Sequence, residues 1–411
     1  MNTPAAVPAT LPMIDGHVHI FSPNAGEPDY DPLASFTLGG DDPGFLESAD
    51  APPTPADLVR LAGQAEQTMV FRYAVEALSG LLGCEPTAAA VREARRDATR
   101  DYDAYLRRLY AEMNLEAMLV DTGYPPGASA EFMESRTGIR SRAIHRIEST
   151  IAASWDGSET LEALETSLLD WMQHGARHEA VAGFKSIIAY RTGLGVAEVT
   201  RAEARRAYDR LKKSSQAQGL LKLIKVPAPL FADVKQVRDF LLWRALETSI
   251  DLGLPFQVHA GLGDSDLDIE QADPGLLATV MRDRRLRRVQ MVLLHTAYPF
   301  HEKAAYLANV FPNVYVDLSL ASPFLVGGGA RVLRSMLELA PFTKLTAGTD
   351  ACGSPELHWV GIRLARASLE AAIAEGVSWS ARPESHADVI RRLVLRDNAA
   401  RLYELGATGK E

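Results

Sequence analysis

The sequence predicts an α/β protein built as a (β/α)8 barrel, or TIM barrel, with a helical insertion after the first strand. Three observations predict it: eight short apolar runs, intervals that admit a helix between most of them, and polar residues at the ends of several runs. Short runs of apolar and β-branched residues are typical of strands buried on both faces of a parallel sheet. Eight such strands alternating with helices favour a closed barrel, with its functional residues at the carboxyl ends of the strands.

The expected strands lie in eight segments of the chain. In chain order they are PMIDGHVHI (12–20), LEAMLVDTGY (115–124), SRAIHRIEST (141–150), AVAGFKSIIAY (180–190), LPFQVHAGLG (254–263), VQMVLLHTAY (289–298), NVYVDLSL (313–320) and KLTAGTDAC (344–352).

Residues 22–114 interrupt this alternation after the first strand. Ser22 to Pro55 is rich in Pro, Gly and Asp, which favour turns, and predicts a long loop. From Thr54 to Met113 the apolar spacing becomes helical, with Thr54 and Pro55 at a helix start. No linker, internal repeat or low-complexity tract divides the chain. We therefore expect residues 1–411 to form one domain, in which residues 22–114 act as a lid.

Composition limits the classes of partner. The 43 basic and 53 acidic residues give a net charge of −10, which disfavours broad attraction to nucleic-acid phosphates or anionic membranes. No apolar run is long enough to span a bilayer, and the first residues lack the pattern of a secretory signal. We expect a cytoplasmic protein that acts on a small molecule and could form a homo-oligomer. Cys84 and Cys352 are too few and too far apart for a disulfide scaffold or a thiolate zinc site.

Histidines and one aspartate mark the ends of four expected strands. His17 and His19 point to one side of the first strand, because residues i and i+2 of a strand share a face. His259, His295 and Asp350 end the fifth, sixth and eighth strands. Each histidine alone could be a surface or core residue. Four imidazoles and a carboxylate at one barrel mouth instead predict a divalent metal site, with zinc first and manganese or iron as alternatives.

The motifs IDGHVHIF, QVHAGLGD, LLHTAYP and GTDAC resemble the amidohydrolase superfamily, specifically its amidohydrolase-related (Amidohydro_2-type) branch of hydrolases and non-oxidative decarboxylases. GFKSIIAYRTGL and PFQVHAGLGDSDLD look most like the barrel that precedes a glutamine-synthetase-type domain in certain fusion proteins. The resemblance implies that His17, His19, His259 and Asp350 are metal ligands or metal neighbours. It implies that His295 is a proton-transfer residue or an additional ligand.

Lys185 in GFKSI has two interpretations. In binuclear members of the superfamily, a carbamylated lysine at the end of strand four bridges two metals, and Lys185 lies on the expected strand four. The alternative is an unmodified ammonium that is buried or faces the substrate. We prefer this second interpretation, and with it a single metal ion.

Other polar residues near the strand ends are candidates for binding substrate. Arg146 and Glu148 in IHRIES share one face by the period-two rule, and they could pair with each other or bind substrate. Lys185 is a further candidate for binding substrate. Arg191 in AYRTG could bind a substrate carboxylate through two parallel hydrogen bonds, or it could hold its own loop in place. Trp359 could line the pocket or pack in the core. The remaining histidines are expected to be structural or surface residues: His145, His174, His178, His301, His358 and His386.

Together these features predict a metal-dependent hydrolase. A divalent cation would activate water to cleave an amide or related C–N bond of a small carboxylate-bearing substrate. Asp350 would accept the proton from water and pass it to the leaving group, while His295 hydrogen-bonds the carbonyl oxygen. A γ-glutamyl amide is suggested by the fusion-protein resemblance alone. The alternatives are a metal-dependent non-oxidative decarboxylase and a non-catalytic metal-binding barrel.

Overall fold

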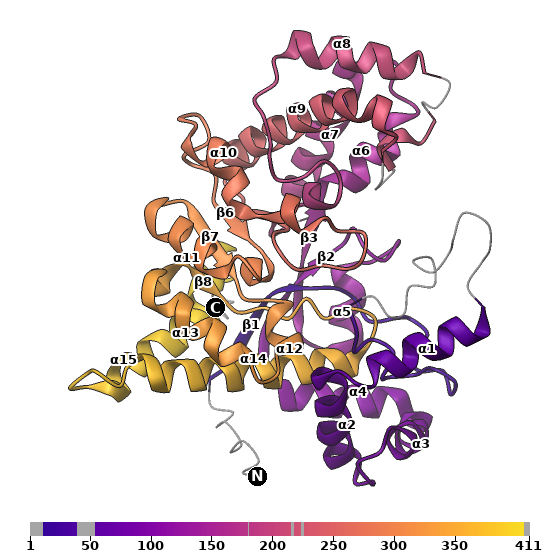
Figure 1. The fold of residues 1–411 in the computed structure, drawn as a ribbon, viewed down its shortest axis with the longest axis vertical. Coiled ribbons are helices and arrows are strands. Elements are labelled where there is room, and N and C mark those ends of the chain that lie inside the picture. Colours follow the sequence, from indigo (N-terminus) through magenta and orange to yellow (C-terminus); the bar gives the residue numbers. More distant parts are fainter. Residues whose placement is uncertain (1–10, 39–53, 180, 215–217, 223–225, 407–411) are drawn as a thin grey trace.

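Eight parallel strands form the barrel, and their order around the sheet follows their order in the chain (Figure 1). The computed structural model describes residues 11–38, 54–179, 181–214, 218–222 and 226–406. The strands are β1 (Met13–Val18), β2 (Leu115–Asp121), β3 (Arg140–Arg146), β4 (Gly183–Ser186), β5 (Phe256–Val258), β6 (Met291–Leu293), β7 (Val314–Asp317) and β8 (Leu345–Thr346). Each strand overlaps its predicted segment, so the prediction of an α/β barrel is confirmed.

Backbone hydrogen bonds join β1 to the segment around β8. The amide of Gly16 donates to the carbonyl of Ala347 at 2.8 Å, and the amide of Asp350 donates to the carbonyl of His17 at 2.8 Å. Phe21 and Gly353 form a further parallel bridge. We call these two stretches, residues 13–21 and 345–353, the seam, and its bonds connect the first strand to the last.

Apart from β3, the strands are buried over most of their length. Every residue of β1, β4, β5 and β6 is buried. The smaller of two apolar clusters includes Ile14, Leu119 and Val292 from the strands and is joined by Leu402 and Tyr403 at the end of the last helix, α16 (Asn398–Leu402). The larger cluster packs strand residues against the surrounding helices.

The predicted helical insertion after the first strand is present. It consists of α1 (Pro55–Ala65), α2 (Met69–Leu82), α3 (Ala88–Ala98) and α4 (Tyr102–Met113). Thr54 caps α1 as expected, because its side chain accepts a hydrogen bond from the amide of Asp57. In the predicted loop, residues 22–38 form turns, whereas residues 39–53 lie outside the described residues. The role of this insertion as a lid stays a prediction.

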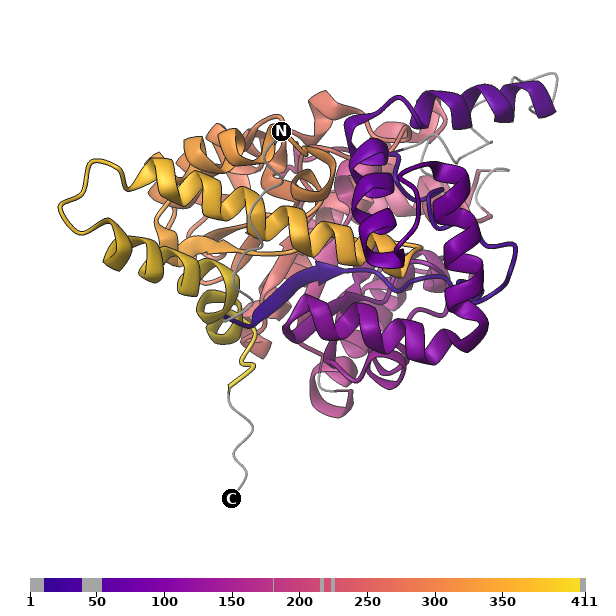
Figure 2. The same ribbon diagram turned by 90° about the horizontal axis from the view of Figure 1, so that it is seen from below.

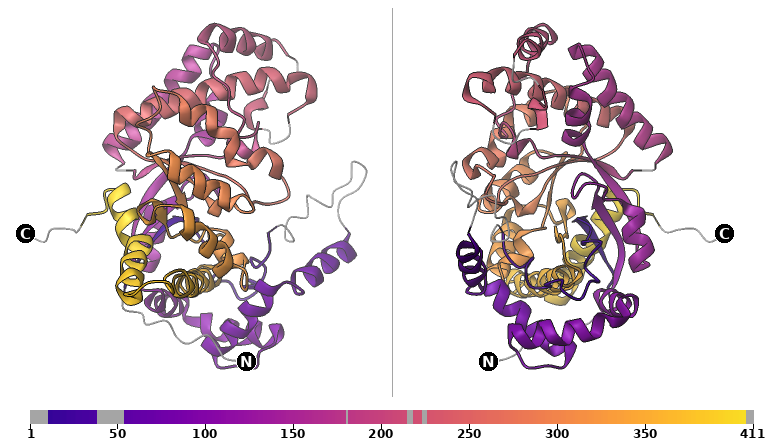
Figure 3. Two further views of the ribbon diagram at one scale, coloured as in Figure 1. Left: turned by 60° about the vertical axis from the view of Figure 1, so that its left-hand side comes forward. Right: turned by 90° about the vertical axis from the view of Figure 1, so that its right-hand side faces the viewer.

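A second group of helices, which the sequence did not reveal as an insertion, lies between β4 and β5. It consists of α8 (Arg201–Lys212) and α9 (Ala228–Leu252), which pack with α7 (Leu161–His178); α7 in turn packs on α6 (Ile147–Trp155). Figures 1 and 3 show this group and the first insertion at opposite ends of the molecule.

The remaining helices cover the outside of the barrel. They are α5 (Ala130–Thr137), α10 (Ala278–Arg282), α11 (His301–Val310), α12 (Ala321–Phe324), α13 (Gly329–Leu339), α14 (Pro355–Gly376) and α15 (Pro383–Arg392). The long helix α14 packs against α13 and α15 and also reaches α2 and α4 of the first insertion (Figure 2). Within the part of the chain that the structure describes, no helix combines the length and apolar composition needed to cross a membrane.

Candidate metal centre

His17 presents its Nε2 atom to the carboxyl end of the barrel because its Nδ1 atom is already engaged. His17 Nδ1 lies 2.8 Å from Gln257 Oε1. Two hydrogen bonds of its nitrogen fix the orientation of the Gln257 amide: Gln257 Nε2 donates to the carbonyl of Gly16 at 2.9 Å and to the hydroxyl of Tyr403 at 2.8 Å. His17 therefore donates from Nδ1, which leaves a lone pair on Nε2.

His19 is oriented in the same way by a backbone group. Its Nδ1 atom lies 3.0 Å from the carbonyl oxygen of Tyr124, which can only accept a hydrogen bond. The proton is therefore on Nδ1, and Nε2 of His19 also carries a lone pair. Both histidines of the His-x-His motif thus present the atom that a metal ion requires.

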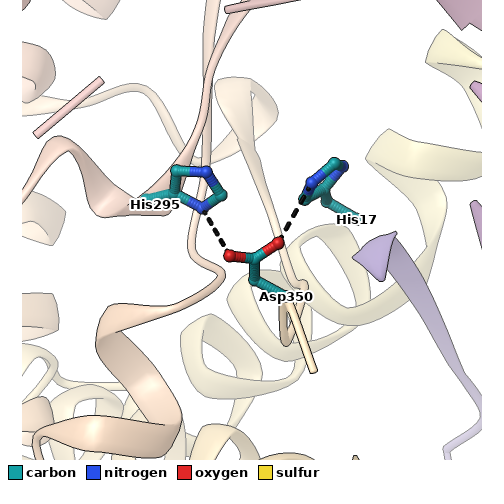
Figure 4. A group of neighbouring side chains, drawn as sticks. All are labelled: His17, His295 and Asp350. Carbon is teal, nitrogen blue, oxygen red and sulfur yellow. Dashed lines mark ion pairs between the residues drawn. The ribbon is translucent and has the colours of Figure 1, made fainter. Parts of the chain in front are cut away.

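The carboxylate of Asp350 lies between histidines of different strands (Figure 4). Its Oδ1 atom is 3.1 Å from His17 Nε2 and 3.3 Å from His19 Nε2, and its Oδ2 atom is 3.6 Å from His295 Nδ1. Burial opposes ionisation, but the neighbouring histidines, His295 foremost, hold the pKa of Asp350 well below its usual range. Asp350 is therefore an ionised acceptor at the centre of the group.

His259 and His295 complete the cluster of imidazoles. Their ring centroids are 4.3 Å apart, and the ring of His295 is 5.6 Å from that of His17. Burial, aided by the nearby Lys185 ammonium, holds the pKa of both His259 and His295 well below the usual value, so both rings are neutral. Neutral imidazole is the form that binds metal.

The surroundings of His295 favour one of its two predicted roles. Its Nδ1 atom lies 3.0 Å from Ser319 Oγ and faces the Asp350 carboxylate. An ionised carboxylate only accepts, so the single proton of a neutral His295 is favoured on Nδ1. Nε2 then has a lone pair, which suits a metal ligand better than a donor to a carbonyl oxygen.

These side chains fit a divalent cation. The ligand atoms of His17, His295 and Asp350 lie within 4.8 Å of one another, as do those of His17, His19 and Asp121. Among the described residues, His259 Nε2, His295 Nε2 and Asp350 Oδ1 are buried without a hydrogen-bond partner. Imidazole nitrogen and carboxylate oxygen are ligands of zinc, manganese and iron, so a cation would satisfy atoms that the protein leaves unpaired.

The backbone is strained at two of these residues. His295 has φ +64° and Asp350 has φ +56°, which is the left-handed region that non-glycine residues rarely adopt. Such conformations cost on the order of 1–3 kcal/mol each and cluster at functional sites. The surrounding contacts must therefore hold these two side chains in position.

Asp121, which the sequence analysis did not single out, is the main partner of two predicted substrate-binding residues. Its Oδ2 atom is 2.9 Å from Lys185 Nζ and 2.6 Å from Arg146 Nη2. Burial opposes ionisation, but Lys185 and Arg146 hold the pKa of Asp121 well below its usual range. Lys185 Nζ also donates to His17 Nε2 at 2.8 Å. Substrate contact by Lys185 and Arg146 stays a prediction. Asp121 ends β2, so the strand-end rule could have identified it.

The prediction that Arg146 and Glu148 share a strand face is wrong. Strand β3 ends at Arg146 and helix α6 begins at Ile147, so the period-two rule does not reach Glu148. Arg146 pairs with Asp121, whereas Glu148 Oε1 accepts from Ser186 Oγ at 2.5 Å.

Asp15 connects the two halves of the seam. Its Oδ1 atom accepts from the amides of His17 at 3.2 Å and Thr349 at 3.0 Å. Its Oδ2 atom accepts from Thr349 Oγ1 at 2.6 Å and lies 2.9 Å from His358 Nε2. His358 is thus a buried structural partner, as expected. Asp15 orients the segments that carry His17 and Asp350.

Gly16 is a glycine because the barrel approaches it too closely for a side chain. A Cβ atom there would lie 2.8 Å from Asp317 Oδ2 and 2.9 Å from the carbonyl oxygen of Ala347. The close packing brings β1 against the segment that follows β8.

Several other histidine and tryptophan residues have partners outside the cluster or are exposed. His145 stacks on Trp171, with ring centroids 4.8 Å apart, and Trp359 is buried and donates to Glu112 at 3.1 Å. His174, His178 and His386 are exposed. Neither cysteine forms a disulfide bond.

The fold and this cluster define an α/β barrel with a candidate His/Asp metal site, and the comparison with known proteins supports this class. The family model described as amidohydrolase matches residues 173–405, and the chain belongs to this family. The family resemblance predicted from the motifs is therefore confirmed. Membership supports a metal-dependent enzyme, without deciding between hydrolase and lyase.

Individual relatives extend the comparison. Protein fluG of Emericella nidulans is 34% identical over 233 residues, which are 55% of this chain and 26% of that protein. The chain thus spans about a quarter of the length of this curated relative. A structure from Lactobacillus casei described as a metal-dependent hydrolase is 24% identical, with a TM-score of 0.76 over 97% of this chain and 96% of that one. A uronate isomerase from Thermotoga maritima is 14% identical, with a TM-score of 0.65 over 96% and 95%. At these identities the two structures show the fold alone.

Proposed function

We propose that the protein is a metal-dependent hydrolase that cleaves an amide or related C–N bond of a small substrate bearing a carboxylate. The observation that supports it most is the set of buried unpaired atoms, His259 Nε2, His295 Nε2 and Asp350 Oδ1, among the described residues. Neutral nitrogen and ionised oxygen ligands with room for a further ligand are typical of catalytic rather than structural metal sites.

The metal ion would be held by His17, His19, His259 and Asp350, with His295 as an additional ligand. Zinc is the first choice from these ligand types, and manganese or iron is the alternative. When bound, a divalent cation supplies Lewis-acid chemistry, which activates water and polarises a carbonyl group.

Asp350 would move the proton. Its ionised carboxylate accepts a proton from the attacking water, and the same proton then passes to the nitrogen of the leaving amine as the C–N bond breaks. Asp350 Oδ2 lies 3.6 Å from His295 Nδ1, so His295 can keep the carboxylate oriented during both transfers.

The cation binding can be tested through the opening motif. We expect the His17→Ala/His19→Ala protein to lose most of its divalent metal, measured by elemental analysis of the purified protein. The matched control is His174→Ala/His178→Ala, which removes two exposed histidines from α7 and should keep the metal. Full metal retention in a folded His17→Ala/His19→Ala protein would remove this pair from the ligand set.

The contacts of Lys185 favour one metal ion per chain. A carbamate on Lys185 would put a second negative charge beside the Asp121 carboxylate, whereas an ammonium is compensated by it at 2.9 Å. We expect reconstitution to yield one ion and to be indifferent to bicarbonate. Two tightly bound ions, with bicarbonate required for the second, would establish the carbamate instead.

The reaction class can be tested with two sets of substrates. γ-Glutamyl amides and hydroxylated benzoates are incubated with metal-loaded and metal-free protein, and amine and CO₂ release are followed in parallel. We expect metal-dependent amine release from an amide. Metal-dependent CO₂ release without amide cleavage would establish the decarboxylase alternative.

A further inference from the structure

A row of buried hydrogen bonds runs from the first insertion to the seam. The hydroxyl of Tyr110, on α4, lies 3.1 Å from His358 Nδ1, and His358 Nε2 lies 2.9 Å from Asp15 Oδ2. His358 belongs to the first turn of α14, whereas Asp15 belongs to β1. All three side chains are buried. The row therefore connects three separate elements through the interior of the protein.

The direction of these hydrogen bonds follows from the groups at the two ends of the row. Burial raises the pKa of the Tyr110 phenol well above its usual value, so the phenol keeps its proton. Among the described residues, His358 Nδ1 is the sole hydrogen-bond partner of that phenol, so Nδ1 accepts and carries no hydrogen of its own. His358 then has its single hydrogen on Nε2, from which it donates to the carboxylate of Asp15.

Asp15 connects the row to the backbone that carries the proposed metal ligands. Its Oδ1 atom accepts from the amides of His17 and Thr349, and its Oδ2 atom accepts from Thr349 Oγ1 at 2.6 Å. Thr349 directly precedes Asp350, whose positive φ requires support from its surroundings. His358 is the second donor to Asp15 Oδ2, so its hydrogen bond helps to hold the carboxylate in the orientation that serves both sides of the seam.

A neighbouring contact joins the same two helices without reaching Asp15. Trp359 Nε1, on α14, donates at 3.1 Å to Glu112, which lies two positions after Tyr110 on α4. Among the described residues, the side chain of Asp15 has only the four hydrogen bonds given above, and none of them involves this pair. The pair is therefore a control for the junction of α4 and α14.

We propose that His358 is a positioning residue of the metal centre: through Asp15 it holds the backbone before Asp350 against the first strand, and Tyr110 keeps the His358 hydrogen on Nε2. The first insertion is thereby connected to the metal centre whether or not it acts as a lid. The proposal rests on the proposed binding of a cation, but it does not depend on which bond the enzyme cleaves.

Two amide variants separate the roles of the two nitrogens of His358. The amide of glutamine reaches the position of Nε2, so His358→Gln can still donate to Asp15 but loses the contact with Tyr110. The amide of asparagine reaches the position of Nδ1, so His358→Asn keeps the contact with Tyr110 and leaves Asp15 without this donor. The proposal requires His358→Gln to preserve the metal centre and His358→Asn to impair it.

The first measurement is the dissociation constant for Zn²⁺, determined by competition with a chromophoric chelator on full-length protein from which metal has been removed. His358→Asn should weaken Zn²⁺ binding at least about tenfold, as loss of outer-shell contacts does, and His358→Gln by less than about threefold. Glu112→Ala removes the acceptor of Trp359 and should leave the affinity unchanged. Equal affinities of wild type and His358→Asn, or equal losses in the two His358 variants, would overturn the proposal.

Hydrogen exchange provides a second readout, which needs no metal ion. The amide of Thr349 donates to Asp15 and the amide of Asp350 donates to the carbonyl of His17, so peptides spanning residues 346–352 report on both. In metal-free protein, these amides should exchange faster in His358→Asn than in His358→Gln or Glu112→Ala. Identical exchange in the three variants contradicts the proposal.

Urea denaturation verifies that each variant folds. If His358→Asn does not fold, Tyr110→Phe takes its place, because it removes a single oxygen atom and leaves the hydrogen of His358 free to move to Nδ1. Faster exchange of residues 346–352 in Tyr110→Phe than in Glu112→Ala supports the proposal, and equal exchange in these two variants overturns it.

The two proposals fail in different ways. If wild-type protein binds no divalent cation, the proposed function fails, and exchange of residues 346–352 alone decides whether His358 holds the backbone before Asp350. If Zn²⁺ binds with equal affinity to wild type and to both His358 variants, the positioning role is refuted and the proposed function is unaffected.

Discussion

Two clusters of buried charge lie at the ends of β2, β3 and β4, and they differ in how their charged groups contact one another. Around Asp121, two cations contact the same anion: Lys185 Nζ and Arg146 Nη2 both lie within 2.9 Å of one carboxylate oxygen. Removing the carboxylate from such a group destabilises the folded protein, because it leaves buried charges uncompensated.

Around Glu148 the same residue types remain apart. Ser186 donates to one oxygen of Glu148, but the other oxygen and two nitrogens of Arg191 have no partner among the described residues. The difference teaches that the charged groups of the first cluster are in direct contact with one another, whereas the second leaves polar atoms unpaired among the described residues. Replacing a carboxylate by an amide should therefore change turnover or the free energy of unfolding by an amount that depends on the groups the carboxylate contacts.

The largest effect is expected at the metal centre. Asp350→Asn should reduce turnover by about 10²–10⁴-fold, because an amide cannot accept the proton from water. The comparison uses the amide substrate of the wild type, with metal occupancy matched and folding verified by circular dichroism. Activity within a few-fold of wild type would rule out proton transfer by Asp350.

Asp121→Asn should have the largest effect on stability. The amide leaves Lys185 and Arg146 buried with their charges uncompensated, and removal of one partner of a buried ion pair costs about 3–5 kcal/mol. Urea denaturation of metal-free wild type and variant measures the free energy of unfolding. A loss below about 1 kcal/mol would show that the two clusters do not differ in the way described.

Asp317, at the end of β7, should give stability a dependence on pH. Burial raises the pKa of Asp317 to about 7, even though Ser319 and Thr346 donate hydrogen bonds to it. The folded protein thus retains this proton at pH values where the unfolded chain, with a pKa near 3.9, has lost it. Stability from this group is complete below about pH 4 and is lost as pH rises through about 7.

The comparison is between wild type and Asp317→Asn, whose amide does not titrate. The free energy of unfolding of wild type, relative to the variant, should fall by up to about 4 kcal/mol between about pH 4 and pH 7. Urea denaturation at several pH values measures it. Parallel curves for the two proteins would contradict the raised pKa.

The smallest effect is expected at Glu148. Glu148→Gln retains an acceptor for Ser186 and breaks no ion pair, so the free energy of unfolding should change by about 1 kcal/mol or less. A loss of stability as large as that of Asp121→Asn would show that Glu148 already neutralises Arg191.

The parts of the molecule that follow from local pattern were predictable. Apolar runs identified the eight strands, and the period of a strand put His17 and His19 on one side. The helix start at Thr54 was also evident from the sequence. Asp121 obeys the strand-end rule and could have been identified, since it lies at the end of β2.

Other features depend on tertiary contacts that leave no local signal. Glu148 was assigned to a strand because nothing in IHRIES indicates that β3 ends at Arg146. Arg238 lies within a 25-residue helix of ordinary composition, and only the packing of α9 brings it to Arg191. Gln257 is a single polar residue in an apolar strand, whose role depends on partners from elsewhere in the barrel.

The seam has a consequence for how the protein is made. Asp15 bonds to Thr349, 334 residues further along the chain, and the carboxylate of Asp350 meets the imidazoles of His17 and His19 across the same junction. During translation, the first two histidines emerge early, but the aspartate that completes their site leaves the ribosome only after nearly the whole barrel has been synthesised. The proposed metal site can therefore be completed only late in the maturation of the protein, and release of a shortened chain before residue 350 would leave the opening histidines without their carboxylate.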